Sequence, residues 1–199
     1  MVERLRAGGI ADPRVLAAMG EVPRERFVPA APVVAAYGDH PLDIGLGQTI
    51  SAPWIVAFCT AALDLAPDAR VLEIGTGSGY GAAVLARCCR HVLTVERHPS
   101  LAERARAVLA AVGVDNVEVR TGDGAAGAPD DAPFDGIVVT AMATAQPPQA
   151  LLRQLTPDGT LVCPVGWDGD GVLMRYRADR AESLVAVRFV PLVSGRAER

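Results

Sequence analysis

One stretch decides the fold of this chain: Arg70-Val71-Leu72-Glu73-Ile74-Gly75-Thr76-Gly77-Ser78-Gly79-Tyr80. Its apolar first half is typical of a buried parallel strand, and we expect a helix over residues 79–88. The alternating glycines between them lack a Cβ, so the backbone can turn sharply and lie close against a ligand. The N–H groups at the start of the helix would point at that ligand. The stretch therefore predicts a nucleotide-type binding site.

Carboxylates near the ends of the predicted strands indicate which nucleotide. Glu73 interrupts the first strand, Glu96 ends the apolar run at 91–96, and Asp123 follows the third run. Glu96 is placed to accept hydrogen bonds from both hydroxyls of a ribose. Three carboxylates would repel a phosphate-bearing ligand and attract a cationic nucleoside without phosphate. S-adenosylmethionine, which carries a sulfonium and an ammonium group, fits this description better than NAD does.

The spacing of the glycines also argues against NAD as the ligand. The dinucleotide fingerprint G-x-G-x-x-G, started at Gly75, has Tyr80 where glycine is required. Started at Gly77, it reads Gly77-x-Gly79-x-x-Ala82, a tolerable match that begins beyond the end of the strand. An NAD-dependent oxidoreductase is therefore disfavoured and is kept as an alternative.

Apolar runs and amphipathic stretches alternate along the rest of the chain. Strands are predicted at 70–74, 91–96, 116–121, 134–140 and 159–163, with a closing pair at 171–177 and 184–190. Helices are predicted near 79–88, 99–112 and 148–155. This alternation predicts an α/β fold with a doubly wound, mostly parallel sheet, whose ligands bind at the carboxyl ends of the strands. The residues that fall at that edge are Gly75, Glu96, Asp123 and Thr140.

The region before residue 70 is predicted to hold helices and one long loop. Two short helices are expected within 1–21, the second begun by Asp12-Pro13, and 37–47 is predicted to be a loop. A further helix is expected after Ser51-Ala52-Pro53. Its apolar residues recur at helical spacing: Trp54, Phe58, Ala61, Ala62 and Leu65.

Composition excludes several function classes. With 199 residues, half of them apolar, the chain suits one domain with a sizeable core. A formal net charge of −4 argues against a general nucleic-acid binder, and the absence of lysine excludes a Schiff-base enzyme. Four cysteines without C-x-x-C spacing and three scattered histidines argue against a metal site. The N-terminus lacks the apolar core of a signal peptide, and no apolar run approaches the roughly 20 residues that span a bilayer, so we expect a cytoplasmic protein without membrane contact.

Several motifs beyond the glycine turn indicate a family. They are Val-Pro-Arg-x-x-Phe-Val-Pro at 22–29, Gly47-Gln48-Thr49-Ile50-Ser51, the stretch at 71–80, Gly122-Asp123-Gly124-x-x-Gly127, and Pro164-Val165-Gly166. Over nearly its whole length the chain resembles the protein-L-isoaspartate (D-aspartate) O-methyltransferase family. The glycine turn is shared by many methyltransferases, whereas the Gly-Gln-Thr-Ile-Ser element is much narrower.

The resemblance implies an activity and an organisation. The activity is methyl transfer from S-adenosylmethionine to the free carboxylate of an L-isoaspartyl residue in damaged proteins and peptides; the ester then collapses spontaneously to a succinimide. The chain would be one methyltransferase domain, 1–199, acting as a monomer. Its parts would be an N-terminal acceptor-site region (1–66), a cofactor-binding core (67–166) and closing strands (167–199).

The resemblance also implies residue roles. Ser51 would hold the acceptor carboxylate near the methyl group, with Gln48, Thr49 and Ile50 shaping the substrate side. The cofactor would be bound by Glu73, Gly75, Thr76, Gly77, Ser78, Glu96, Asp123, Gly124 and Thr140. Because a carboxylate is already ionised at pH 7, the reaction needs no general base, and catalysis should consist mainly of positioning and exclusion of water.

Plainer roles stay open for some of these residues. Ser51 could cap the helix that follows it, a role expected alongside the catalytic one. Glu73 could be ion-paired, Asp123 could stabilise a turn, and Thr140 could be structural. The chain departs from the family pattern at Asp43, at Leu46 and in the stretch 141–148, all on the acceptor side. Two other functions therefore stay open: a carboxyl methyltransferase of the same family dedicated to an aspartate of one peptide, and a non-catalytic nucleoside-binding module.

Overall fold

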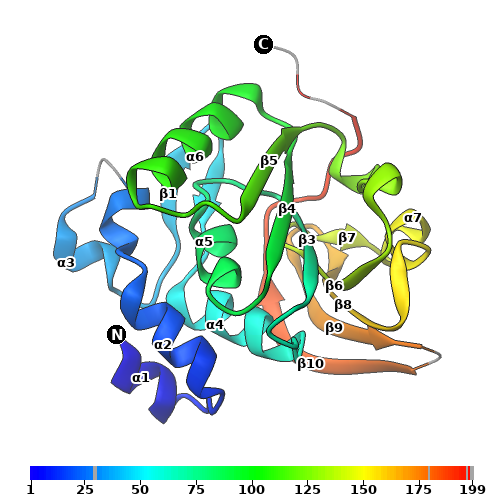
Figure 1. Ribbon diagram of the computed structural model, residues 1–199, viewed down its shortest axis with the longest axis horizontal. Coiled ribbons are helices and arrows are strands. Elements are labelled where there is room, and N and C mark those ends of the chain that lie inside the picture. Colours follow the sequence, from blue (N-terminus) through cyan, green and yellow to red (C-terminus); the bar gives the residue numbers. More distant parts are fainter. Residues whose placement is uncertain (29–30, 179, 196, 198–199) are drawn as a thin grey trace.

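Figure 1 presents the computed structural model of the protein, which describes residues 1–28, 31–178, 180–195 and 197. Its centre is a sheet with strand order β10-β9-β8-β6-β3-β4-β5, and β7 pairs with β8 outside this path. The strands are β3 (Arg70–Ile74), β4 (His91–Glu96), β5 (Val117–Thr121), β6 (Phe134–Val139), β7 (Ala143–Thr144), β8 (Leu155–Trp167), β9 (Asp170–Arg177) and β10 (Arg180–Arg188). Strands β3 to β8 pair in parallel, and β9 and β10 join antiparallel. The prediction of a mostly parallel α/β sheet is confirmed.

The central strands are apolar because both of their faces are covered. In β3 the side chains of Val71 and Leu72 are both 0% exposed, although they point to opposite faces of the sheet. Val71 packs in a cluster with residues of the helices on one face, and Leu72 packs in a second cluster with Leu151 on the other face. A strand buried on both sides reads as a continuous apolar run, which is why its position could be predicted.

Helices cover both faces of the sheet. Those on the first face are α4 (Pro53–Ala62), α5 (Tyr80–Ala86) and α6 (Pro99–Ala111), with α1 (Val2–Ala7) and α2 (Pro13–Glu21) packed outside them. The second face carries α7 (Gln149–Leu152) and the short 3-10 helices η2 (Gly124–Ala126) and η3 (Pro129–Asp131). The Asp12 side chain accepts hydrogen bonds from the backbone N–H groups of Arg14 and Val15, so the predicted start of α2 is confirmed.

The N-terminal region also corrects one prediction. After η1 (Arg24–Phe27) and α3 (Val33–Ala36), the segment predicted to be a loop at 37–47 contains β1 (Leu42–Gly45), which pairs antiparallel with β2 (Gln48–Ile50). Gly45, Leu46 and Gly47 all have positive φ angles and form the tight turn of this hairpin. Glycine is typical both of loops and of such turns, and this short strand offers too little apolar alternation to distinguish them. Pro29, the last residue of one family motif, lies outside the described residues.

The predicted boundaries of other elements shift by a few residues. Strand β8 begins at Leu155 rather than 159, and this shortens α7, which was predicted to extend to 155. In α4 the predicted apolar stripe is only partly buried: Trp54 and Phe58 stack on each other with ring centroids 4.7 Å apart, while Ala57 has no exposed surface. Within the described ranges, no helix is long and apolar enough to cross a membrane.

Candidate functional site

The glycine turn between β3 and α5 has the backbone that its sequence requires. Gly75 and Gly79 adopt φ angles of +96° and +90°, which side chains with a Cβ rarely tolerate. A Cβ at position 75 would also stand less than 3.0 Å from Oγ1 of Thr140. The Thr140 hydroxyl occupies that space and donates toward the carbonyl oxygens of Ile74 (3.0 Å) and Gly75 (2.8 Å). The turn therefore lies directly against the end of β6.

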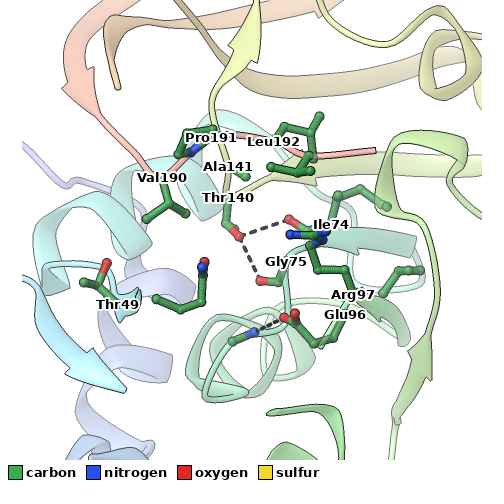
Figure 2. Close-up of a pocket in the computed structure, with 15 residues that line it drawn as sticks. Thr49, Ile74, Gly75, Glu96, Arg97, Thr140, Ala141, Val190, Pro191 and Leu192 are labelled. Carbon is green, nitrogen blue, oxygen red and sulfur yellow. Dashed lines mark hydrogen bonds between the residues drawn. The ribbon is translucent and has the colours of Figure 1, made fainter. Parts of the chain in front are cut away.

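The carboxylate of Glu96 is fixed beside this turn, as Figure 2 shows. One oxygen, Oε2, accepts a 2.9 Å hydrogen bond from the backbone N–H of Gly77, and Oε1 accepts one of 2.9 Å from the N–H of His98. The side chain is only 5% exposed. Because each oxygen can accept further hydrogen bonds, the carboxylate can still bind two neighbouring hydroxyls of a ligand.

A pocket opens above the turn at the carboxyl ends of the strands. Its empty space, which includes open solvent, amounts to about 560 Å³. Seven of the predicted site residues line it: Gln48, Thr49, Gly75, Gly77, Glu96, Gly124 and Thr140. The structure thus brings together residues from the hairpin, the turn after β3, the end of β4, η2 and the segment after β6 around one cavity.

Four residues predicted to bind the cofactor do not line this pocket. The hydroxyl of Thr76 is 2.7 Å from that of Thr94, which donates a 2.6 Å hydrogen bond to Glu73. Ser78 Oγ accepts a 3.4 Å hydrogen bond from the N–H of Tyr80. Asp123 accepts from the N–H of Ala125 and so begins η2, as the turn interpretation expected. The expected ring of three carboxylates is therefore not assembled around this pocket, because only Glu96 reaches it.

Glu73 points instead into the layer between the sheet and α5. Its side chain is 1% exposed, and burial raises the pKa of Glu73 to about 8 even though the Thr94 hydrogen bond acts in the opposite direction. A Cβ at Gly81 would overlap its Oε1, so the glycine makes room for the carboxyl group. No ion pair with Glu73 occurs among the described residues, which removes the salt-bridge interpretation.

Ser51 lines a second cavity next to the first. This cavity encloses about 880 Å³, again partly open to solvent, and its lining includes Ser51, Ile55, Arg188 and Phe189. Its other lining residues are Pro41, Thr49, Ala52, Thr140, Gly169 and Val190. Three of these, Thr49, Thr140 and Val190, also line the first pocket, so the two cavities share a wall.

The two neighbours of Ser51 in the sequence also have structural roles. Ile50 is 4% exposed and packs in the hydrophobic core rather than in either cavity. Helix α4 has Ala52 as its N-cap, and the N–H of Trp54 donates a 2.9 Å hydrogen bond to Asp39. The prediction that Ser51 caps this helix is therefore wrong; a side chain distant in sequence takes that role and leaves Ser51 to the cavity.

Sequence reasoning missed the part of the site made by the C-terminal segment. Val190, Pro191, Leu192 and Val193 all line the first pocket. The segment is fastened to Met142, whose N–H donates to the carbonyl of Val190 (2.7 Å) and whose carbonyl accepts from the N–H of Leu192 (2.8 Å). The resemblance to the family extends over this segment without giving it a role, and no local pattern there indicates a binding site.

Comparison with known proteins assigns the family. The family model described as Protein-L-isoaspartate(D-aspartate) O-methyltransferase (PCMT) matches residues 1–197. This chain belongs to that family. A protein-L-isoaspartate O-methyltransferase 2 of Pelobacter propionicus is 53% identical over 197 residues, which cover 96% of this chain and 87% of the relative. A protein-L-isoaspartate O-methyltransferase of Methanoregula boonei is 54% identical over 201 residues, covering 97% and 91% of the two chains.

Solved structures of isoaspartate methyltransferases have the same fold. One aligns with a TM-score of 0.86 and 29% identity over 96% of this chain and 65% of its own chain, so the present chain spans less than two thirds of that protein. A beta-aspartate methyltransferase (PCMT) from Plasmodium falciparum aligns with a TM-score of 0.83 and 25% identity over 96% of both chains. That structure is a complex with S-adenosyl-L-homocysteine.

The three expected departures from the family pattern lie in the β1–β2 hairpin and after β6. Leu46 is 56% exposed in the β1–β2 turn, just before the pocket residues Gln48 and Thr49. The stretch 141–148 starts directly after Thr140, and part of it forms β7 alongside β8. Leu46 and the stretch 141–148 are therefore close in sequence to the shared-wall residues Thr49 and Thr140.

Proposed function

We propose that this protein transfers a methyl group from S-adenosylmethionine to the free carboxylate of L-isoaspartyl residues in damaged proteins and peptides. The observation that carries the proposal is the shared wall of Thr49, Thr140 and Val190 between the two cavities. A nucleoside donor in the first cavity and a carboxylate in the second would meet across this wall. The relatives at 53% and 54% identity, which are named for this activity, support the same assignment.

The residues of the first pocket fit an adenosyl ligand that lacks phosphate. The Glu96 carboxylate, already oriented by two backbone N–H groups, would bind the ribose hydroxyls and disfavour phosphate at that end. Gly75 and Gly77 would let the methionine part approach the backbone closely, and Gly124 would border the adenine. When bound, S-adenosylmethionine supplies an electrophilic methyl group on its sulfonium. Thr76, Ser78 and Asp123 would support the walls of this pocket through their own hydrogen bonds.

Ser51 would orient the acceptor. Its hydroxyl can donate a hydrogen bond to one oxygen of the isoaspartyl carboxylate, and so aim the other oxygen toward the shared wall. The carboxylate is ionised at pH 7, so no residue is needed as a general base. Orientation of this kind can lower a barrier by up to about 7–11 kcal/mol. Apolar neighbours such as Ile55 and Phe189 would exclude water from the anionic nucleophile.

The repair step follows without further catalysis. In the methyl ester made at the isoaspartyl carboxylate, methoxide can leave far more easily than the oxygen of a free carboxylate. The nitrogen of the neighbouring backbone amide attacks the ester carbonyl, methanol leaves with the amide proton, and a succinimide forms. The protein therefore has to bind an extended, flexible segment and release the ester. A cavity that is open to solvent on one side suits such a substrate.

Methyl transfer from labelled S-adenosylmethionine to paired peptides tests the proposal. Each pair has one sequence with either aspartate or L-isoaspartate at the same position. The expected result is isoaspartate-selective labelling in several unrelated sequences. Labelling of an aspartate in one peptide alone would favour the dedicated methyltransferase, and cofactor binding in calorimetry without transfer to any peptide would favour the nucleoside-binding module.

We further propose that the protein acts as a monomer in the cytoplasm. Its four cysteines are all buried and unpaired, which suits a reducing compartment. Light scattering of the purified protein at assay concentration tests the first statement, and fractionation of the native cells tests the second.

A further inference from the structure

Arg24 is a fully buried cation that contacts the backbone of Ser51, directly after β2. Its side chain is 0% exposed within η1. Nε donates a 2.7 Å hydrogen bond to the carbonyl of Ala36, and Nη2 donates one of 2.7 Å to the carbonyl of Ser51. The guanidinium carbon also lies 4.7 Å from the ring centroid of Tyr80. Nη1 has no hydrogen-bond partner among the described residues.

Stability alone does not account for this arrangement. A buried charge is costly to remove from water, and it is normally paired with a carboxylate. Arg24 has no such ion pair within the described parts of the chain; its contacts are two carbonyl groups and an aromatic ring. Consistent with this, burial lowers the pKa of Arg24. An apolar side chain would fill the site at lower cost, but it could not hold the two carbonyls.

The contacts of Arg24 join the two halves of the site. Ser51 follows β2 directly and lines the acceptor cavity. Tyr80 is the first residue of α5 and follows the glycine turn of the cofactor pocket directly. The planar guanidinium therefore links the backbone carbonyl of Ser51 to the Tyr80 ring, next to that turn. The Ala36 carbonyl, at the C-terminus of α3, fixes the orientation of the guanidinium plane.

We infer that Arg24 is a positioning residue for methyl transfer, which acts by holding the backbone of Ser51 at a set distance from the glycine turn. Through this contact it determines how well the acceptor carboxylate is aligned with the donor methyl group. It touches neither substrate nor cofactor, because its side chain has no exposed surface. The inference rests on the proposed function and adds a residue to it.

The substitution Arg24→Lys tests this role. Lysine keeps the positive charge near Tyr80, but a single ammonium group cannot hold both carbonyls in the same plane. We expect kcat with an isoaspartyl peptide to fall about 10- to 100-fold, while the Kd for S-adenosylhomocysteine changes less than about 2-fold. Arg26→Lys is the matched control, because Arg26 lies in the same 3-10 helix and is exposed; its kcat should equal that of the wild type.

A double-mutant cycle with Ser51→Ala distinguishes a positioning role of Arg24 from a general loss of structure. If Arg24 acts through Ser51, adding Arg24→Lys to Ser51→Ala lowers kcat by less than about 3-fold, since the aimed hydroxyl is already gone. If the two losses multiply instead, the inference is overturned. Arg24→Gln, which buries no charge, repeats the cycle should the lysine variant unfold. Wild-type protein inactive on every isoaspartyl peptide would contradict the proposed function itself, which is a different outcome from additive losses in an active enzyme.

Discussion

The backbone N–H of Gly77 donates a 2.9 Å hydrogen bond to Oε2 of Glu96. This contact ties the turn after β3 to the last residue of the adjacent strand β4. The carboxylate is consequently held in position before any ligand binds, and it lines the first pocket. A preorganised acceptor loses little freedom on binding, so a change at Glu96 should affect a ligand in this pocket directly.

Glu96→Gln should weaken cofactor binding. Both carboxylate oxygens face backbone N–H groups, those of Gly77 and His98, so an amide must place its NH₂ group against one donor. The loss of charge-assisted hydrogen bonds to the ribose is worth roughly 1.5–3 kcal/mol, or about a 10- to 100-fold higher Kd for S-adenosylhomocysteine. Calorimetry measures this, with the exposed Glu103→Gln on α6 as control. An unchanged Kd would exclude Glu96 from the binding site.

Gly75→Ala should destabilise the protein more than the same change at Gly113. Both glycines have positive φ, +96° and +71°, so both variants pay the backbone cost of roughly 1–2 kcal/mol. Only at position 75 does the new Cβ also overlap Oγ1 of Thr140, which adds roughly 1–3 kcal/mol; nothing lies within 4 Å at Gly113. Urea unfolding measures the difference. The second change Thr140→Ala should recover part of the loss at position 75, and equal losses at both glycines would contradict this account.

The sequence was sufficient for the parts of the fold that depend on local pattern. Strands β3 and β4 occupy the predicted positions because residues such as Val71 and Leu93 are buried and leave an uninterrupted apolar run. The glycine turn and Glu96 could be predicted for the same reason, since both follow such a run directly. Glu73 does not end its strand, because Ile74 still follows it within β3. The Glu73 side chain therefore lies in the layer between the sheet and α5 and does not reach the carboxyl edge of the sheet.

Features that depend on contacts between distant segments could not be predicted from the local sequence pattern. The hairpin of β1 and β2 is specified by the pairing of Leu42 with Ile50 across a glycine-rich turn, and its strands are too short to show a period. The wall made by Val190 and its neighbours exists because Met142, far away in sequence, binds that segment. Asp39, which is also distant in sequence, caps helix α4 in place of Ser51. The local sequence pattern does not indicate which distant segments come into contact.

Ser51→Ala should lower turnover and leave cofactor affinity unchanged. Ser51 lines the second cavity and is absent from the lining of the first, so under the proposed function its hydroxyl would act on the acceptor alone. A hydrogen bond to a charged acceptor is worth roughly 1.5–3 kcal/mol, which corresponds to a kcat about 10- to 100-fold lower. Ser100→Ala, at an exposed position of α6, is the control for the chemical change. Turnover equal to the wild type would remove Ser51 from the mechanism.

Glu73 should make the stability of the protein fall as the pH rises from about 4.5 to about 8. Burial raises the pKa of Glu73 from 4.5 to about 8, so in this window the folded state keeps a proton that the unfolded state has released. The free energy of unfolding therefore decreases as the pH rises. The full cost of ionising the buried Glu73 carboxyl group applies only above about pH 8. One pKa unit corresponds to about 1.4 kcal/mol, so the total amounts to a few kcal/mol.

The variant Glu73→Gln isolates this contribution. The amide cannot ionise, and its oxygen can still accept the hydrogen bond that Thr94 donates to Glu73. We expect the melting temperatures of the two proteins to diverge as the pH rises from 5 to 8, with the glutamine variant the more stable at pH 8. Other titrating groups are common to both proteins and cancel in the difference. Parallel curves over this range would mean that Glu73 is ionised in the folded protein, and that its carboxylate is stabilised by a contact other than the Thr94 hydroxyl.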